Sequence, residues 1–151
     1  MKLHTHKFEQ FLPISLDEAW DFFSKPDNLN EITPEDMKFE ILTKDISNMY
    51  QGQVIQYNVT PFPLIKMGWV TEITHVKNEA YFVDEQRFGP YAMWHHEHHF
   101  RSNGEETIME DIIHFKMPLG FLGRIAYALF AKKQLHKIFT FRKEEVAKVF
   151  T

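Results

Sequence analysis

The chain has 151 residues, of which 44% are hydrophobic and 25% are charged, and its formal net charge is −4 at pH 7. These values are typical of a globular protein, and we expect one domain over residues 1–151 rather than a disordered or coiled-coil chain. The absence of cysteine excludes disulfides, cysteine-based zinc sites and thiol nucleophiles, and the negative charge argues against nucleic acid as a partner. No apolar run reaches the roughly 20 residues of a membrane helix and the N-terminus does not resemble a signal peptide, so we expect a cytoplasmic protein without an integral membrane segment.

The first predicted elements are a strand and two short helices. Residues 3–12 alternate as a strand does, without indicating which side is buried. Ser15 and Glu18 have the spacing of a capping box, in which each residue bonds a free amide at the start of a helix. Pro26 ends this helix, and residues 27–34 predict a second short helix or turn.

Alternation of apolar and polar residues dominates the middle of the chain and predicts about six antiparallel strands. Asn103-Gly104 is the strongest hairpin signal, and Gly89-Pro90 interrupts the alternation between two of the strands. The predicted strands cover residues 37–41, 54–59, 65–73, 80–88, 91–101 and 107–117.

From residue 121 to residue 150 the spacing of apolar residues becomes helical. The apolar stripe consists of Leu122, Ile125, Leu129, Leu135, Phe139, Val146 and Val149. We expect the following charged residues to lie mainly off this stripe: Lys132, Lys133, Lys137, Arg142, Lys143 and Glu144. The whole order predicts an α+β fold, in which a bent antiparallel sheet wraps around the long C-terminal helix and buries both apolar surfaces.

Several motifs along nearly the whole chain resemble one known superfamily. They are Leu16-Asp17-Glu18-Ala19-Trp20-Asp21-Phe22-Phe23, Asn28-Leu29, Ile32-Thr33-Pro34, Phe82-Val83-Asp84-Glu85-Gln86, Gly89-Pro90-Tyr91, Trp94-x-His96-x-His98-x-Phe100, Asp111, Pro118-Leu119-Gly120, Gly123, Phe139 and Arg142. This set resembles the START-like, or SRPBCC, superfamily, which has the helix-grip fold of birch-pollen-allergen and polyketide-cyclase relatives. The nearest group looks like small bacterial proteins, some of them fused to a nucleotide-sugar-epimerase-like domain.

The resemblance implies a cavity between the concave face of the sheet and the long helix, which would hold a hydrophobic or amphipathic small molecule. Period two then indicates which side chains share that face. For example, Phe82, Asp84, Gln86 and Phe88 fall on one side of a strand. The candidate ligand-binding residues are Tyr57, Met67, Trp69, Phe82, Asp84, Gln86, Trp94, His96, His98, Met109, Asp111, Ile113, Phe115, Ile125 and Leu129. We expect a mostly apolar cavity of roughly 300–1,000 Å³.

His96 and His98 project to one side of their strand, where Asp84 and Asp111 can meet them. Three interpretations remain open: a buried hydrogen-bond network, recognition of a polar group on the ligand, or a metal site. We predict no metal, because only two imidazoles converge and a structural zinc site needs four ligands. We also predict no cofactor. His95 and His99 would face solvent.

Binding of the small molecule is the preferred function. The first alternative is a cofactor-free cyclase or dehydratase, whose catalytic residues would come from the same His–Asp cluster. The second alternative is a regulatory interaction module. The apolar loops at residues 61–64 and 118–122 are candidates for the cavity mouth, or for a transient membrane or protein contact.

Overall fold

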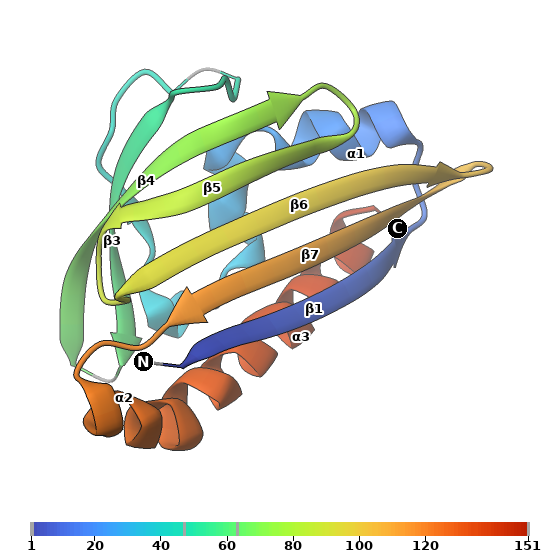
Figure 1. Ribbon diagram of the computed structural model, residues 1–151. Coiled ribbons are helices and arrows are strands. Elements are labelled where there is room, and N and C mark those ends of the chain that lie inside the picture. The colour runs from blue at the N-terminus through green and yellow to red at the C-terminus, as the bar shows by residue number, and fades with distance from the viewer. Residues whose placement is uncertain (1, 47, 63, 151) are drawn as a thin grey trace.

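The computed structural model describes residues 2–46, 48–62 and 64–150, and its main element is a seven-stranded antiparallel sheet (Figure 1). The strand order is β1-β7-β6-β5-β4-β3-β2, so the first and seventh strands pair while the others follow the chain. The strands are β1 (Leu3–Leu12), β2 (Glu40–Ile41), β3 (Val54–Phe62), β4 (Ile65–Lys77), β5 (Tyr81–Phe88), β6 (Met93–Asn103) and β7 (Glu106–Lys116).

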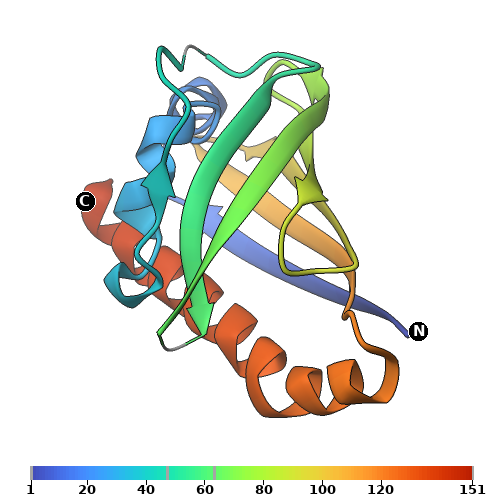
Figure 2. The ribbon, with the colours of Figure 1, turned by 90° about the vertical axis from the view of Figure 1, so that its left-hand side faces the viewer.

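Helical segments cover one face of this sheet, which curves around them (Figures 1 and 2). Three short ones follow the first strand, and the last three form one continuous C-terminal helix. They are α1 (Leu16–Phe23), η1 (Pro26–Ile32), η2 (Glu35–Met37), α2 (Gly120–Ala126), the π-helical turn η3 (Tyr127–Ala131) and α3 (Lys132–Val149). This arrangement confirms the predicted helix-grip fold. Within the described ranges, no helix is long and apolar enough to cross a membrane.

Local sequence signals explain where the first helices begin. The Ser15 amide donates a hydrogen bond to Glu18 Oε2 at 3.0 Å, so the predicted capping box is present. Pro26 is the first residue of η1, a position where its missing amide hydrogen costs nothing. The side chain of Asn28 then donates to the carbonyl of Phe22 at 2.9 Å and ties the two helices together.

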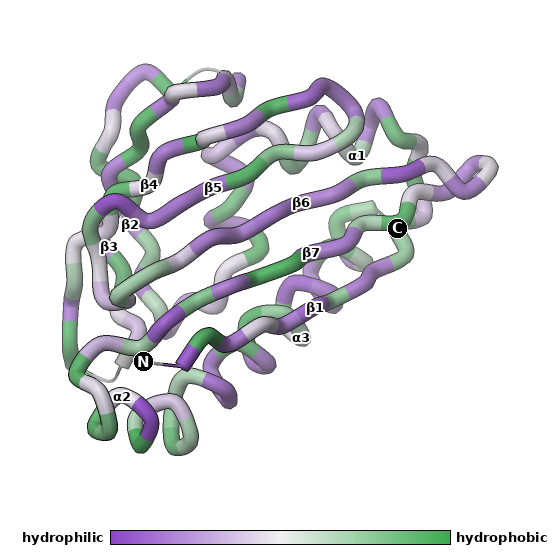
Figure 3. Tube along the Cα trace, viewed as in Figure 1, coloured by the Kyte–Doolittle hydropathy of each residue, from purple (hydrophilic) through white to green (hydrophobic). Residues whose placement is uncertain are grey.

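The alternation in β6 and β7 places their side chains as predicted. His96 pairs with Ile113 and His98 with Asp111, so all four side chains share the concave face. Figure 3 shows hydrophilic and hydrophobic residues mixed along β7, where the pair Glu110-Asp111 is followed by the pair Ile112-Ile113, so hydropathy by itself does not separate the two faces of this strand. The turn at Gly104, whose φ is +72°, joins the two strands at the predicted hairpin.

Two strand predictions are wrong in detail. Only Glu40–Ile41 pair as a strand in the segment predicted at residues 37–41, because η2 occupies its start. Phe88, predicted on the concave face, is 67% exposed. A register shift between Val70 and Thr71 adds a residue to β5 between the partners Gln86 and Phe88. Such a bulge reverses the facing of later side chains, which alternation alone cannot reveal.

The C-terminal helix differs from the predicted stripe in two ways. Some apolar residues of the stripe are exposed, and one charged residue expected off the stripe is buried. Leu122, Ile125 and Leu129 are between 49% and 55% exposed, because the sheet covers the helix only from about Ala131 onward, and Val149 at the far end of the helix is 45% exposed. Arg142, predicted to lie off the stripe, is only 6% exposed.

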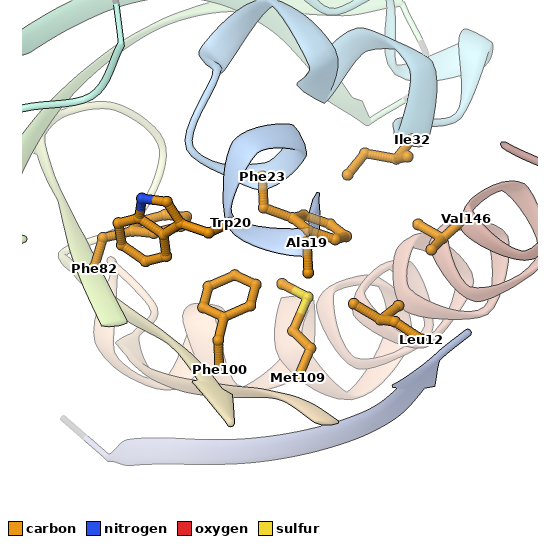
Figure 4. Packing of buried hydrophobic residues seen from close by; sticks show 9 residues of the cluster. All are labelled: Leu12, Ala19, Trp20, Phe23, Ile32, Phe82, Phe100, Met109 and Val146. Atoms are coloured by element: carbon orange, nitrogen blue, oxygen red, sulfur yellow. The ribbon is translucent and has the colours of Figure 1, made fainter. Parts of the chain in front are cut away.

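The two ends of the sheet are packed by separate clusters of hydrophobic residues. The first joins α1, the strands and the end of α3, as Figure 4 shows. Its members are Leu12, Ala19, Trp20, Phe23, Ile32, Phe82, Phe100, Met109 and Val146. The second cluster consists of Ile113, Phe115, Met117, Ala131 and Leu135. Between the two, the curved sheet stands away from the helix and leaves the space described next.

Candidate ligand-binding site

A cavity of about 190 Å³ lies between the concave face of the sheet, the short helices and α3. Its walls are mostly apolar, and the His–Asp cluster forms a polar area within them. The predicted ligand-binding residues that line it are Tyr57, Trp69, Phe82, Asp84, Trp94, His96 and His98. Strands β3 to β6 therefore contribute the predicted part of the wall.

Four predicted residues on β7 lie behind this wall. Met109, Ile113 and Phe115 are fully buried within the two hydrophobic clusters and do not line the cavity. Asp111 is 4% exposed and contacts the imidazoles that do. The placement on the concave face is right, but neighbouring side chains cover these positions.

The other predicted residues outside the cavity have individual reasons for their positions. Met67 pairs with Val59, which lines the cavity, but Met67 itself does not line it. Gln86 bonds both backbone groups of Tyr91 (Nε2 to the carbonyl at 2.7 Å, the amide to Oε1 at 3.0 Å) and so holds the turn after β5. Ile125 and Leu129 lie on the exposed part of the C-terminal helix and do not line the cavity.

Several lining residues were not predicted as ligand contacts, and Arg142 is the most informative. With Leu135, Phe139 and Val146 it has the spacing 4-3-4, which is that of one helix face. This spacing could have placed the arginine on the buried side, but its charge argued for solvent. Residues of α1, η1 and the loops after them, such as Phe22, Leu29 and Met49, also contribute to the wall, and no strand alternation could have indicated them, whereas Phe39 and Ile41 belong to the alternation predicted at residues 37–41.

The cavity is smaller than the predicted 300 Å³ because aromatic rings close one end of it. The Tyr91 ring lies 4.8 Å from the Trp94 ring and 5.7 Å from the Trp69 ring, measured between centroids. Beyond Tyr91 lies a second cavity of about 170 Å³. It lies beneath α2, between the two loops predicted as a mouth, and Pro61 and Tyr91 line both cavities.

The His–Asp cluster is a closely bonded group. His96 Nε2 lies 2.7 Å from Asp111 Oδ1, and His98 Nε2 lies 2.7 Å from Asp84 Oδ2. His98 Nδ1 is 3.1 Å from Asp111 Oδ1, and Arg142 NH1 approaches the same oxygen at 3.4 Å. The two imidazoles stack with centroids 3.8 Å apart. The predicted partners therefore meet, and Arg142 joins them.

Burial and neighbouring charges set the protonation of each group. Burial would raise the pKa of Asp111 and Asp84, but hydrogen bonds from the imidazoles and the positive charges of His98 and Arg142 hold both pKa values below the ordinary one. Burial would lower the pKa of His98, yet its contacts with both carboxylates raise it. Burial and the charge of His98 together lower the pKa of His96.

These directions describe a cluster without net charge. Two carboxylates are balanced by His98 and Arg142, while His96 stays neutral, which avoids the cost of an unpaired buried charge. Because Asp111 accepts a hydrogen bond from Nε2 of neutral His96, Nδ1 of that ring carries the lone pair. Within the described part of the chain Nδ1 has no hydrogen-bond partner, and Asp84 Oδ2 lies 3.8 Å from it. In this tautomer His96, which lines the cavity, keeps one acceptor atom for a ligand.

A metal ion would compete with this arrangement. Asp84, His96 and His98 each place a ligand atom within 4.8 Å of the others, a spacing that could surround a cation. A ligating imidazole must lose its proton, whereas the two carboxylates favour protonated His98. The guanidinium of Arg142 adds further positive charge nearby. The absence of a metal stays a prediction.

The sequence matches no protein-family model and no curated protein. Solved structures are similar in fold. The Zhui aromatase/cyclase from Streptomyces sp. R1128 has a TM-score of 0.74 at 13% identity, over 97% of this chain and 95% of that one. Ginseng major latex-like protein 151 from Panax ginseng has a TM-score of 0.71 at 12% identity, over 98% and 97%.

A norcoclaurine synthase variant from Thalictrum flavum, in complex with a transition-state analogue, has a TM-score of 0.69 at 14% identity, over 99% of this chain and 98% of that one. At these identities the comparison shows the fold. The chain has the helix-grip fold of the major latex-like proteins and aromatase/cyclases, as its motifs predicted.

Proposed function

We propose that this protein binds a small apolar molecule that carries a hydroxyl group. The observation that carries the proposal is the apolar cavity of about 190 Å³, which is lined by His96; because Nε2 of this ring is held by Asp111, we infer that Nδ1 is the acceptor left for a ligand. For comparison, an engineered apolar cavity of about 150 Å³ binds benzene. The volume therefore suits a ligand of one or two rings.

The surroundings of His96 determine which polar group the ligand carries. The lone pair on Nδ1 accepts a hydrogen bond, so the ligand supplies the donor, and a phenol or alcohol does so without bringing a charge into an apolar cavity. Trp69, Trp94 and Phe139 line the same space and give it an aromatic wall, which suits an aromatic ligand. The fold relatives named above include two enzymes, an aromatase/cyclase and a norcoclaurine synthase, which is consistent with an organic ligand.

A pair of probes that differ by one hydroxyl tests this proposal. We expect 2-naphthol to quench the fluorescence of Trp69 and Trp94, and to bind about fivefold more tightly than naphthalene, because one net hydrogen bond is worth about 1 kcal/mol. His96→Phe keeps a ring but removes both nitrogens, and should abolish the preference while naphthalene still binds. His95→Ala, on the outer face, is the matched control and should leave it unchanged.

Two results would contradict the proposal in different ways. If neither probe binds, and native mass spectrometry with solvent extraction finds no retained small molecule, the cavity is not a ligand site. If both probes bind equally well to the parent protein, the cavity binds apolar molecules but His96 does not select a hydroxyl.

Proton transfer is the second candidate function, and the Asp111–His96 pair favours it. A neutral imidazole whose second nitrogen is held by a carboxylate can act as a general base toward a bound substrate. Such a cyclase or dehydratase would need no cofactor. Its activity should be lost in His96→Phe while binding of naphthalene persists. Under either function we place the protein in the cytoplasm, and a regulatory interaction module would show neither binding nor turnover.

A further inference from the structure

Charge is distributed very unevenly along this acidic chain. Residues 112–143 contain no aspartate or glutamate but seven lysines and arginines. Residues 17–45 contain nine acidic residues against three lysines. The basic segment builds the C-terminal half of the fold from the end of β7 through most of α3, so a positive region exists although the net charge is −4.

The start of the C-terminal helix also exposes apolar side chains. Phe121 is 63% exposed, Leu122 54%, Ile125 49% and Leu129 55%. Their spacing places them on one stripe of the helix, on the side away from the sheet. The opposite side carries buried Gly123 and Ala131, while each of the four large apolar residues leaves about half or more of its surface exposed, although Leu122 also lines the second cavity. We call these four residues, three in α2 and Leu129 in η3, the apolar stripe of α2.

Unpaired positive charges accompany this stripe. Arg124, Lys132 and Lys133 are exposed, and none forms an ion pair with a carboxylate in the described ranges. The turn between β3 and β4 lies at the same end of the molecule (Figures 1 and 2), and it presents Leu64 fully exposed. Exposed apolar residues mixed with arginine and lysine are the composition of helices that lie in the interface of a membrane.

We propose that the apolar stripe of α2, with Arg124, Lys132 and Lys133, docks onto the surface of an anionic lipid bilayer. Charge complementarity decides the choice of partner. A second copy of this chain would bring two positive surfaces together and be repelled, whereas anionic headgroups attract them. Apolar side chains at the centre of the surface gain from entry into the acyl boundary, which a purely polyanionic partner would not offer.

The location of the second cavity supports a bilayer as the partner. Leu122 belongs both to the apolar stripe and to the lining of that cavity, which shares Tyr91 and Pro61 with the larger one. Docking would therefore place lipid beside the inner cavities. The docking proposal does not depend on the ligand proposed above.

Sedimentation of the full chain with vesicles tests this proposal. The vesicles contain either phosphatidylcholine alone or phosphatidylcholine with 30% phosphatidylserine. We expect binding to the anionic vesicles at 0.1 M NaCl and release at 0.5 M, although the acidic protein as a whole is repelled by them. Lys132→Gln with Lys133→Gln should lower the partition coefficient about fivefold for each charge removed. Phe121→Ser with Ile125→Ser should lower it at least tenfold.

Matched variants at the other end of the molecule are the controls. Phe11→Ser removes an aromatic residue that is 58% exposed, and Lys44→Gln removes an exposed charge, so both should leave binding unchanged. All substituted residues are exposed, and urea melts check that each variant is folded. Equal binding to both vesicle types, no binding to anionic vesicles, or unchanged binding of the lysine variant would overturn the proposal. A concentration-dependent dimer in light scattering that Phe121→Ser abolishes would show a self-association surface instead.

Discussion

Removal of the Asp111 carboxylate tests the charge-balanced cluster most directly. Asp111 accepts a hydrogen bond from His96 at 2.7 Å and contacts His98 at 3.1 Å and Arg142 at 3.4 Å, and it is only 4% exposed. Asp111→Ala leaves two positive groups facing one remaining carboxylate. Breaking a buried ion pair by removing one partner costs about 3–5 kcal/mol. With a urea m-value of about 2 kcal/mol/M, the midpoint should fall by about 2 M.

Asp111→Asn separates the charge from the hydrogen bond. The amide keeps one acceptor oxygen for His96 but cannot balance a positive charge, so we expect a smaller loss of about 1–3 kcal/mol. In either variant the pKa of His98 should fall, because one of the two carboxylates that raise it is gone. NMR titration of the imidazole follows that change at the same time as the melts.

His95→Ala and His99→Ala are the matched controls. These imidazoles lie on the outer face, where His95 and His99 contact Glu97 and remain 27% and 39% exposed as side chains. Exposed pairs of this kind contribute little, so each variant should stay within about 0.5 kcal/mol of the parent. If His95→Ala destabilises as much as Asp111→Ala, or if Asp111→Asn costs as much as Asp111→Ala, the charge-balanced cluster is the wrong explanation.

Three further predictions concern pH, metal and packing. The raised pKa of His98 should contribute a free energy of unfolding that is complete below pH 6.5 and is lost as pH rises through the pKa of His98 in the folded state. The lowered pKa of His96 should reduce the free energy of unfolding as pH falls below 6.5. Urea melts over this pH range measure both effects, and a free energy of unfolding that does not change with pH contradicts these shifts. Elemental analysis should find no stoichiometric zinc, and one equivalent that is lost in Asp84→Ala would contradict the neutral cluster. Gly123→Ala should lower the free energy of unfolding by about 1–3 kcal/mol, because the added Cβ would overlap the carbonyl oxygen of Pro118. An unchanged midpoint in thermal or urea melts would show that the turn before α2 can shift to make room.

The element order, the concave face and the cluster partners could be predicted from the sequence alone, because each rests on a local rule. Alternation places His96 and His98 on one side of a strand whatever the tertiary fold, and the Asn103-Gly104 turn sets the register that brings Asp111 beside them. The capping box at Ser15 is likewise complete within four residues. Such features need no knowledge of distant parts of the chain.

Other features depend on what covers each residue, and that was decided only by the tertiary structure. Ile113 and Phe115 share the face of His96 yet lie in packed clusters, because α3 approaches them closely and leaves space only in the middle of the sheet. Phe88 turns outward through a bulge that alternation does not reveal. Arg142 is buried because two carboxylates on other elements compensate its charge, and a helical pattern read by itself contains no information about such partners.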